Sequence, residues 1–227
     1  MFYYRRIEMI HGLIFDMDGV LLDSEKIYFQ CWKQSAKEFG FEMQDETIFA
    51  VRSCCSKYAE PYFKRLFGED FCYYDVRERR RELVTQYIEK NGVQQKVGIF
   101  PLIRFCQEQN IQVAVATATS RELAEIRLQM AGLGGVFSKI IGGDDVTCGK
   151  PAPDIYQKAV SELGLEPKEC AAVEDSPNGI ISAFSAGCSV IMVPDMTPPE
   201  TCFHPLLWGV ASNLEKIIPL LLENKEL

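Results

Sequence analysis

Short apolar runs alternate with helical patterns along much of this chain. Leu13 to Phe15 form an apolar run that ends abruptly at Asp16, as a buried strand does where it enters a polar turn. Similar runs predict later strands, with helices between them. These runs are Ile111 to Ala116, Lys139 to Ile141, Ala171 to Val173 and Ser189 to Val193. Repeated strand and helix units of this size predict an α/β fold with a doubly wound, Rossmann-like parallel sheet.

Directly after the first strand, the spacing of apolar residues becomes that of a helix, and it stays helical over residues 24–92. Apolar positions from Ser24 to Phe39 lie on one face of a helix that Gly40 closes. A second helix is predicted from about Ser53 to Phe67. A third is predicted from Asp75 to Asn91, where Glu78 would complete a capping box. We therefore expect residues 1–23 and 93–227 to form the α/β core and residues 24–92 an inserted helical cap domain.

Two later helices carry clear boundary signals. Asp154 to Leu163 place their apolar residues on one face, and Gly164 ends the pattern. Ser176 and Pro177 open another helix, with Ser as N-cap and Pro at the first helical position, and Gly187 closes it. Residues 1–8 precede this framework, and we expect them to be an appendage to the core.

The composition of the chain argues against several classes of partner and location. The chain has 227 residues, with 24 basic and 32 acidic side chains and a formal charge of −8, which argues against nucleic acid or an anionic membrane as a partner. Its nine cysteines include no C-x-x-C pair, so we expect reduced thiols in a cytoplasmic protein. Glu8, His11 and Asp16 interrupt any apolar run near the N-terminus, so we expect no export signal. The long uncharged run 176–194 contains Pro, Asn, Gly and Ser residues and is no membrane helix. We expect a monomer or a weak dimer.

Polar residues gather where the predicted strands end, which is where ligands bind in such sheets. Asp16 and Asp18 follow the first strand, Thr117 the second, and Glu174 with Asp175 the fourth. That many carboxylates in one cleft repel each other unless a hard divalent cation joins them, and Mg²⁺ is the natural candidate. Mg²⁺ shares its coordination shell with substrate phosphate, so the arrangement predicts phosphoryl transfer. Lys150, after the third strand, would neutralise phosphate oxygens.

Four of these segments together resemble the motifs of the haloacid-dehalogenase-like superfamily. They are Asp16-Met17-Asp18-Gly19-Val20, the strand end at Thr117, Gly149-Lys150-Pro151 and Glu174-Asp175-Ser176. They occur in the family's order, each at a predicted strand end. The helical insert directly after the first motif resembles the cap of the β-phosphoglucomutase-like branch.

The resemblance implies a role for each of these residues. Asp16 would be the nucleophile that forms an aspartyl-phosphate, and Asp18 the general acid and then base. Gly19 would permit a tight turn. The metal ligands would be Asp16, Asp18 through its carbonyl, Asp175 and Glu174. The phosphoryl oxygens would be bound by Thr117, the Ala118 amide and Lys150.

Residues of the insert offer weaker signals. Ser24, Tyr28 and Arg52 would face the mouth of the active site if the cap folds over it, so they are candidate substrate contacts. A basic run on the third helix is interleaved with Glu78 and Glu82, which is typical of a solvated, ion-paired face. Steering of an anionic substrate is the alternative for this run. It consists of Arg77, Arg79, Arg80 and Arg81.

We therefore expect a Mg²⁺-dependent phosphatase for a small phosphorylated metabolite. The nearest alternative is a sugar phosphomutase, but similar mutases carry His at the position of Tyr28 and a Gly near residues 50–54, where this chain has neither. A dehalogenase would have no use for Asp18. A phospho-accepting receiver domain would lack the second Asp and the insert. A silent phosphate-binding protein also remains open, although no catalytic position is missing.

Overall fold

The computed structural model describes residues 9–197 and 201–223, so the predicted appendage 1–8 lies outside the described residues. A six-stranded parallel sheet runs in the order β3-β2-β1-β4-β5-β6. This order confirms the predicted Rossmann-like α/β class. The strands are β1 Gly12–Phe15, β2 Gln112–Ala116, β3 Lys139–Ile141, β4 Cys170–Glu174, β5 Ser189–Met192 and β6 Gly209–Val210.

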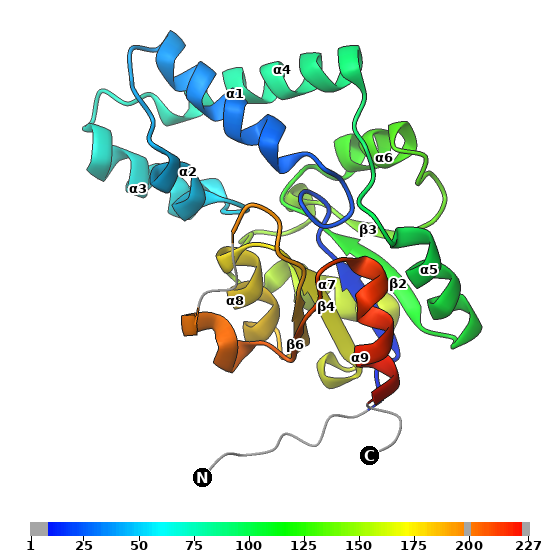
Figure 1. Ribbon diagram of the computed structural model, residues 1–227. Coiled ribbons are helices and arrows are strands. Elements are labelled where there is room, and N and C mark those ends of the chain that lie inside the picture. Colours follow the sequence, from blue (N-terminus) through cyan, green and yellow to red (C-terminus); the bar gives the residue numbers. More distant parts are fainter. Residues whose placement is uncertain (1–8, 198–200, 224–227) are drawn as a thin grey trace.

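Helices cover both faces of the sheet (Figure 1). Side chains alternate along β1, so Leu13 and Phe15 join one hydrophobic cluster while Ile14 joins the other. The first cluster includes residues of α5 (Ile99–Glu108), α6 (Arg121–Met130) and α9 (Ile217–Glu223). The second includes residues of α7 (Asp154–Leu163) and α8 (Pro177–Ser185). The short 3₁₀ helices are η1 Gly143–Asp145, η2 Pro167–Glu169, η3 Thr201–Leu206 and η4 Leu214–Lys216.

The chain between β1 and α5 forms a separate helical layer beside the carboxyl ends of the strands (Figure 1). It has a hydrophobic core of its own, which includes Trp32, Phe63 and Phe71. Aromatic rings stack within this core, such as Phe63 on Phe71 at 5.2 Å between centroids. The helices are α1 Glu25–Glu38, α2 Asp45–Val51, α3 Ser56–Phe67 and α4 Tyr73–Asn91.

Several element boundaries differ from the sequence-based prediction. The third helix predicted for the insert corresponds to α4, which begins at Tyr73. No side-chain cap forms there, so the predicted capping box at Asp75 is wrong. Burial of the Tyr73 ring against Phe63, 5.7 Å between centroids, fixes the first turn instead. The second, α3, begins at Ser56, because Ser53 adopts a positive φ of 58° in a loop.

The predicted N-cap of α8 is confirmed, whereas Ser24, the residue before α1, does not cap its helix with its side chain. The Ser176 hydroxyl accepts a hydrogen bond from the Gly179 amide at 3.1 Å. Ser24 makes no such bond, because its hydroxyl donates to Asp18. Among the described residues, no helix has both the length and the apolar content that crossing a membrane requires.

Candidate active site

Three neighbouring strands bring their carboxyl ends together at the centre of the sheet. β1 pairs with β2 on one side and with β4 on the other. Asp16 follows β1, Thr117 follows β2, and Glu174 is the last residue of β4. The Asp16 amide still donates to the carbonyl of Val173 at 2.9 Å, which fixes its backbone to the neighbouring strand. The sheet register therefore assembles these residues, as their positions at strand ends predicted.

Three carboxylates form a buried acidic cluster at this edge. One oxygen each from Asp16, Glu174 and Asp175 can be chosen so that all three lie within 4.8 Å of one another. Asp16 Oδ2 and both carboxylate oxygens of Asp175 are buried and have no hydrogen-bond partner among the described residues. Buried carboxylate oxygens without partners are costly unless they coordinate a cation. The donor set and its compactness thus fit a divalent metal ion that prefers oxygen ligands.

Lys150 connects two members of this cluster. Its ammonium Nζ donates to Asp16 Oδ1 at 2.6 Å and to Glu174 Oε1 at 2.5 Å, and its side chain is fully buried. Burial lowers the pKa of Lys150, but the carboxylates of Asp16 and Glu174 outweigh this effect and hold the pKa above its usual value. Lys150 therefore stays cationic at the centre of the site.

Glu174 is held by several hydrogen bonds. Besides Lys150, the Tyr156 hydroxyl donates to its Oε1 atom at 2.6 Å. The Ser176 hydroxyl and the Asp175 amide both reach its Oε2 atom at 3.2 Å. A carboxylate with this many donors keeps one orientation, so Glu174 fixes the position of Lys150.

Asp16 itself lies in an environment that disfavours its charge. Burial raises the pKa of Asp16 well above its usual value, Lys150 lowers it, and the neighbouring Glu174 and Asp175 raise it further. A divalent cation at the cluster would favour the ionised carboxylate, which is the nucleophilic form.

Asp18 is not a member of the acidic cluster, and two hydroxyl groups bind its carboxylate. Ser24 donates to Oδ1 at 2.6 Å and Thr119 donates to Oδ2 at 3.2 Å. Gly19 permits the tight turn directly after Asp18. Its φ is +88°, and a Cβ atom there would collide with the Asp175 carboxylate. The D-x-D spacing thus separates a carboxylate among metal-ligand candidates from one among hydroxyls.

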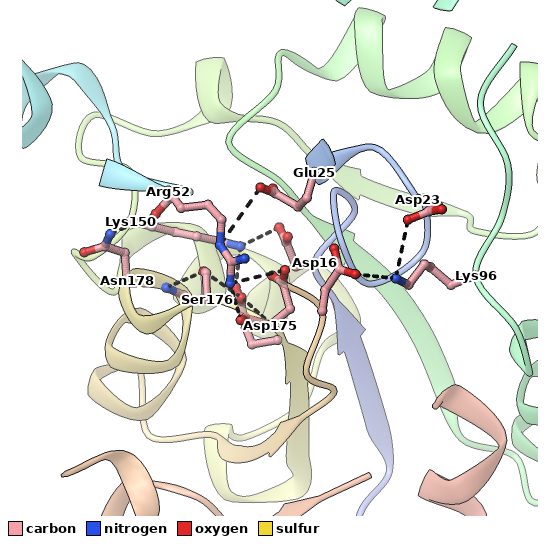
Figure 2. A network of polar contacts seen from close by, with 12 residues as sticks. Asp16, Asp23, Glu25, Arg52, Lys96, Lys150, Asp175, Ser176 and Asn178 are labelled. Atoms are coloured by element: carbon pink, nitrogen blue, oxygen red, sulfur yellow. Dashed lines mark hydrogen bonds and ion pairs between the residues drawn. The ribbon is translucent and has the colours of Figure 1, made fainter. Parts of the chain in front are cut away.

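Arg52 reaches the acidic cluster from the loop that joins α2 to α3 (Figure 2). Its Nη2 atom lies 3.4 Å from Asp175 Oδ2 and donates to the carbonyl of the same residue. Its Nε atom lies 4.0 Å from Glu25 Oε2. The side-chain amide of Asn178 donates to the backbone carbonyl of Arg52 at 2.8 Å. The backbone N–H of Cys55 donates to the carbonyl of Lys150 at 2.9 Å. The helical layer is therefore tied to the core beside the candidate metal ligands.

A cavity of about 420 Å³ lies between the helical layer and the sheet. Among the predicted site residues, six line it: Asp16, Asp18, Thr117, Ala118, Tyr28 and Arg52. Four others are fully buried and do not line it: Ser24, Lys150, Glu174 and Asp175. Ser24 therefore supports Asp18 rather than facing the mouth of the cavity.

Sequence reasoning missed several residues of the site. Tyr156 was recognised only as part of an apolar helix face, although its hydroxyl binds Glu174. Asn178 lies two residues after the predicted N-cap Ser176, and that proximity to the fourth motif was the available signal. Glu25 and Arg127 gave no local signal, because partners distant in sequence bring them to the cavity.

Comparison with known proteins agrees with this geometry. A family model described as haloacid dehalogenase-like hydrolase matches residues 13–193. A Drosophila melanogaster protein named as a probable pseudouridine-5'-phosphatase is 31% identical over 193 residues, 80% of this chain and 80% of its own length. Hexitol phosphatase A of Escherichia coli is 30% identical over 184 residues, 80% of this chain and 82% of its own.

A solved structure extends the likeness to the fold. The crystal structure of CbbY from Rhodobacter sphaeroides in complex with phosphate superposes with a TM-score of 0.76 at 26% identity. The match covers 92% of this chain and 96% of the other. With the family model spanning most of the sequence and with its motif residues gathered at one edge of the sheet, the chain belongs to the haloacid dehalogenase-like hydrolase family.

Proposed function

We propose that the chain is a phosphatase that hydrolyses a small phosphorylated metabolite through an aspartyl-phosphate on Asp16, with Mg²⁺ as its metal ion. The observation that carries the proposal is the convergence of Asp16, Lys150 and the buried acidic cluster, with Asp18 two residues away on a different set of partners. Relatives named as phosphatases for a nucleotide-like and for a hexitol phosphate support the reaction type.

The first step transfers the phosphoryl group to the protein. An Asp16 carboxylate oxygen attacks phosphorus, and the bond from phosphorus to the ester oxygen breaks. Asp18 gives its proton to that leaving oxygen. Ser24 and Thr119 can serve Asp18 in both protonation states, because a hydroxyl group rotates to donate or to accept.

The second step reverses the role of Asp18. Its carboxylate takes a proton from water, the water oxygen attacks phosphorus, and the bond to Asp16 breaks to release inorganic phosphate. Each step moves one proton and exchanges one bond to phosphorus, so Asp16 and Asp18 both return to their starting states.

The remaining core residues bind the transferred group and the metal ion. Thr117, the Ala118 amide and Lys150 would bind the phosphoryl oxygens, whose negative charge grows in the transition state. Asp16, Glu174, Asp175 and the carbonyl of Asp18 would hold Mg²⁺. The ion would supply Lewis-acid charge that offsets the repulsion between phosphate and carboxylates.

The helical layer would act as the cap over this chemistry. We assign residues 24–92 to it, with Tyr28 and Arg52 as the cap residues that reach the substrate. The cavity of about 420 Å³ suits a metabolite-sized ligand rather than a polymer. Exclusion of bulk water by the cap would strengthen the electrostatic contacts to the phosphoryl group.

A screen of phosphorylated metabolites with Mg²⁺ and detection of inorganic phosphate tests this function. We expect phosphate release from at least one monoester without any bisphosphate activator, because water is the acceptor. Isomerisation of glucose 1-phosphate to glucose 6-phosphate faster than phosphate release would replace the proposal with a phosphomutase. Inertness of every monoester would overturn it altogether.

A further inference from the structure

The cavity is lined by more arginine side chains than the proposed phosphoryl transfer uses. Besides Arg52, it is lined by Arg77, Arg80 and Arg81 of α4 and by Arg127 of α6. Arg81 pairs with Glu78 at 3.1 Å. Among the described residues, Arg77, Arg80 and Arg127 have no carboxylate within 4.0 Å. The basic run on α4 is therefore ion-paired only in part, contrary to the favoured prediction.

Arg80 is stabilised by aromatic faces instead of an anion. Its guanidinium carbon lies 4.6 Å from the centroid of the Trp32 ring and 5.1 Å from that of Tyr28. Such stacking satisfies the face of a guanidinium and leaves the N–H groups at its edge free to donate. The Nε atom of Arg80 is buried and has no hydrogen-bond partner in the part of the chain that the structure describes. Burial lowers the pKa of Arg80, and Arg77 and Arg127 lower it further, which outweighs the opposite effect of Tyr28 and Tyr73.

Arg127 approaches the same aromatic ring. It is only 3% exposed, and its guanidinium carbon lies 5.5 Å from the centroid of the Tyr28 ring. It donates to the Tyr28 hydroxyl. Two guanidinium groups thus converge on one tyrosine ring, and an anion between them would offset their mutual repulsion. A carboxylate or a phosphate would accept paired hydrogen bonds from their planar edges.

A chain of hydrogen bonds connects this basic cluster to the reacting groups. Arginine can only donate, so the Tyr28 hydroxyl directs its own proton to Thr119 at 3.4 Å. Thr119 in turn donates to Asp18 at 3.2 Å. Tyr28 is thus two hydrogen bonds from the general acid, within the span of a small metabolite. A single substrate can place one end at Asp16 and the other at the arginines.

We propose that the substrate carries a second anionic group, a carboxylate or a second phosphate, which Arg80 and Arg127 bind at the cap end of the cavity. This inference rests on the proposed phosphatase function and adds the class of substrate. It makes the two arginines specificity-determining residues, because they contact a part of the substrate distant from the bond that breaks.

Matched pairs of substrates test the inference. 3-Phosphoglycerate differs from glycerol 3-phosphate by a carboxylate, and fructose 1,6-bisphosphate differs from fructose 1-phosphate by a second phosphate. We expect kcat/KM for the anionic member to be at least about tenfold higher in one of these pairs. The pair that shows the preference identifies the second group. Equal kcat/KM within both pairs would overturn this inference while leaving the phosphatase function intact.

Variants of Arg80 and Arg127 test whether these two residues cause the preference for the anionic substrate. Arg80→Gln and Arg127→Gln are each expected to remove about tenfold of kcat/KM for the anionic member, mainly through KM, and to leave the neutral member within about twofold. Arg80→Lys should restore part of the loss. Arg79→Gln is the matched control, because Arg79 pairs with Glu38 and Glu82 outside the cavity lining. Equal losses for both members would indicate a structural role and contradict the proposal.

A binding measurement separates this inference from the proposed reaction. Calorimetric titration of Asp16→Asn protein with the same pairs reads affinity without turnover. Tighter binding of the anionic member, abolished by adding Arg127→Gln, would support the second anionic site even if no monoester were hydrolysed. Indifference of the Asp16→Asn protein to the second group would contradict it.

Discussion

The Arg52 guanidinium lies against Asp175, with 3.4 Å between Nη2 and Oδ2, although one residue belongs to the helical layer and the other follows the central sheet. Both side chains are buried, at 4% and 0% exposure. Burial lowers the pKa of Arg52, but Asp175 and Glu25 outweigh this effect and hold it above its usual value. A permanent cation therefore stands beside the carboxylates proposed to bind the metal ion.

This contact predicts competition between Arg52 and a divalent cation. Arg52→Gln should bind Mg²⁺ about tenfold more tightly or better, because it removes a buried positive charge next to Asp175. Calorimetric titration of Mg²⁺ without substrate measures this directly. Arg79→Gln, which changes the net charge equally at the surface, is the control. Unchanged or weaker Mg²⁺ binding by Arg52→Gln would show that the guanidinium does not oppose the ion.

Removal of the metal ion should abolish phosphate release. A chelator should reduce activity to background, and Mg²⁺ should restore it better than Ca²⁺, because Ca²⁺ accepts more ligands and loosens the in-line geometry. Asp175→Ala should raise the Mg²⁺ concentration that gives half-maximal activity. Full activity in chelator, or an unchanged Mg²⁺ titration for Asp175→Ala, would contradict the assigned site.

Asp18→Asn should lower the rate by about 10² to 10⁴, the usual contribution of general acid and base catalysis. The rate of the first step should fall least with nitrophenyl phosphate, because nitrophenolate leaves without needing a proton. Burst kinetics compared with an unactivated alkyl phosphate would measure the difference. If the first step slowed equally for both esters, Asp18 would not be the acid.

Glu25 predicts a dependence of stability on pH. The pKa of Glu25 is raised from 4.5 to about 8: burial has the largest effect, Arg52 lowers the pKa, and Asp18, Asp16 and Asp195 raise it. Between these two values the folded state retains a proton that the unfolded state releases, so the free energy of unfolding should fall as pH rises from about 5 to 8. Above that range the contribution of Glu25 is lost.

Glu25→Gln mimics the protonated carboxyl group and isolates this contribution. Denaturant unfolding in chelator at several pH values should give a shallower decline for the variant than for the natural chain. Asp16 and Asp175 also have raised pKa values and should retain the rest of the slope. Identical slopes for the two proteins would mean that Glu25 is ionised across this range.

The sequence predicted those elements whose hydrophobic pattern extends over many residues. It also predicted the site residues that directly follow a strand. Asp16, Thr117 and Glu174 could be placed because parallel strands in register bring their ends together. Helix α2 spans only Asp45–Val51, too short to show a period. Helix α5 was not predicted, although Ile99, Leu102 and Cys106 lie at helical spacing and are buried.

Contacts between the helical layer and the core could not be predicted. Arg52 lies 123 positions before Asp175, and Arg127 lies 99 positions after Tyr28. No local pattern encodes such pairs, because they depend on how the layer docks over the sheet. The basic run on α4 shows the same limit: Arg79 is ion-paired outside the cavity, while Arg80 next to it lines the cavity. Only the docked structure distinguishes the two.

The central claim is that Asp16 carries the phosphoryl group, and acid quenching during turnover tests it most directly. Mass spectrometry of the digested protein should find the mass of one phosphoryl group on the peptide that contains Asp16, in the natural chain but not in Asp16→Asn. The variant should also lose turnover while keeping its unfolding transition, because the substitution preserves volume. Phosphate release by Asp16→Asn near the natural rate, or a phosphoryl group on another residue, would contradict the account.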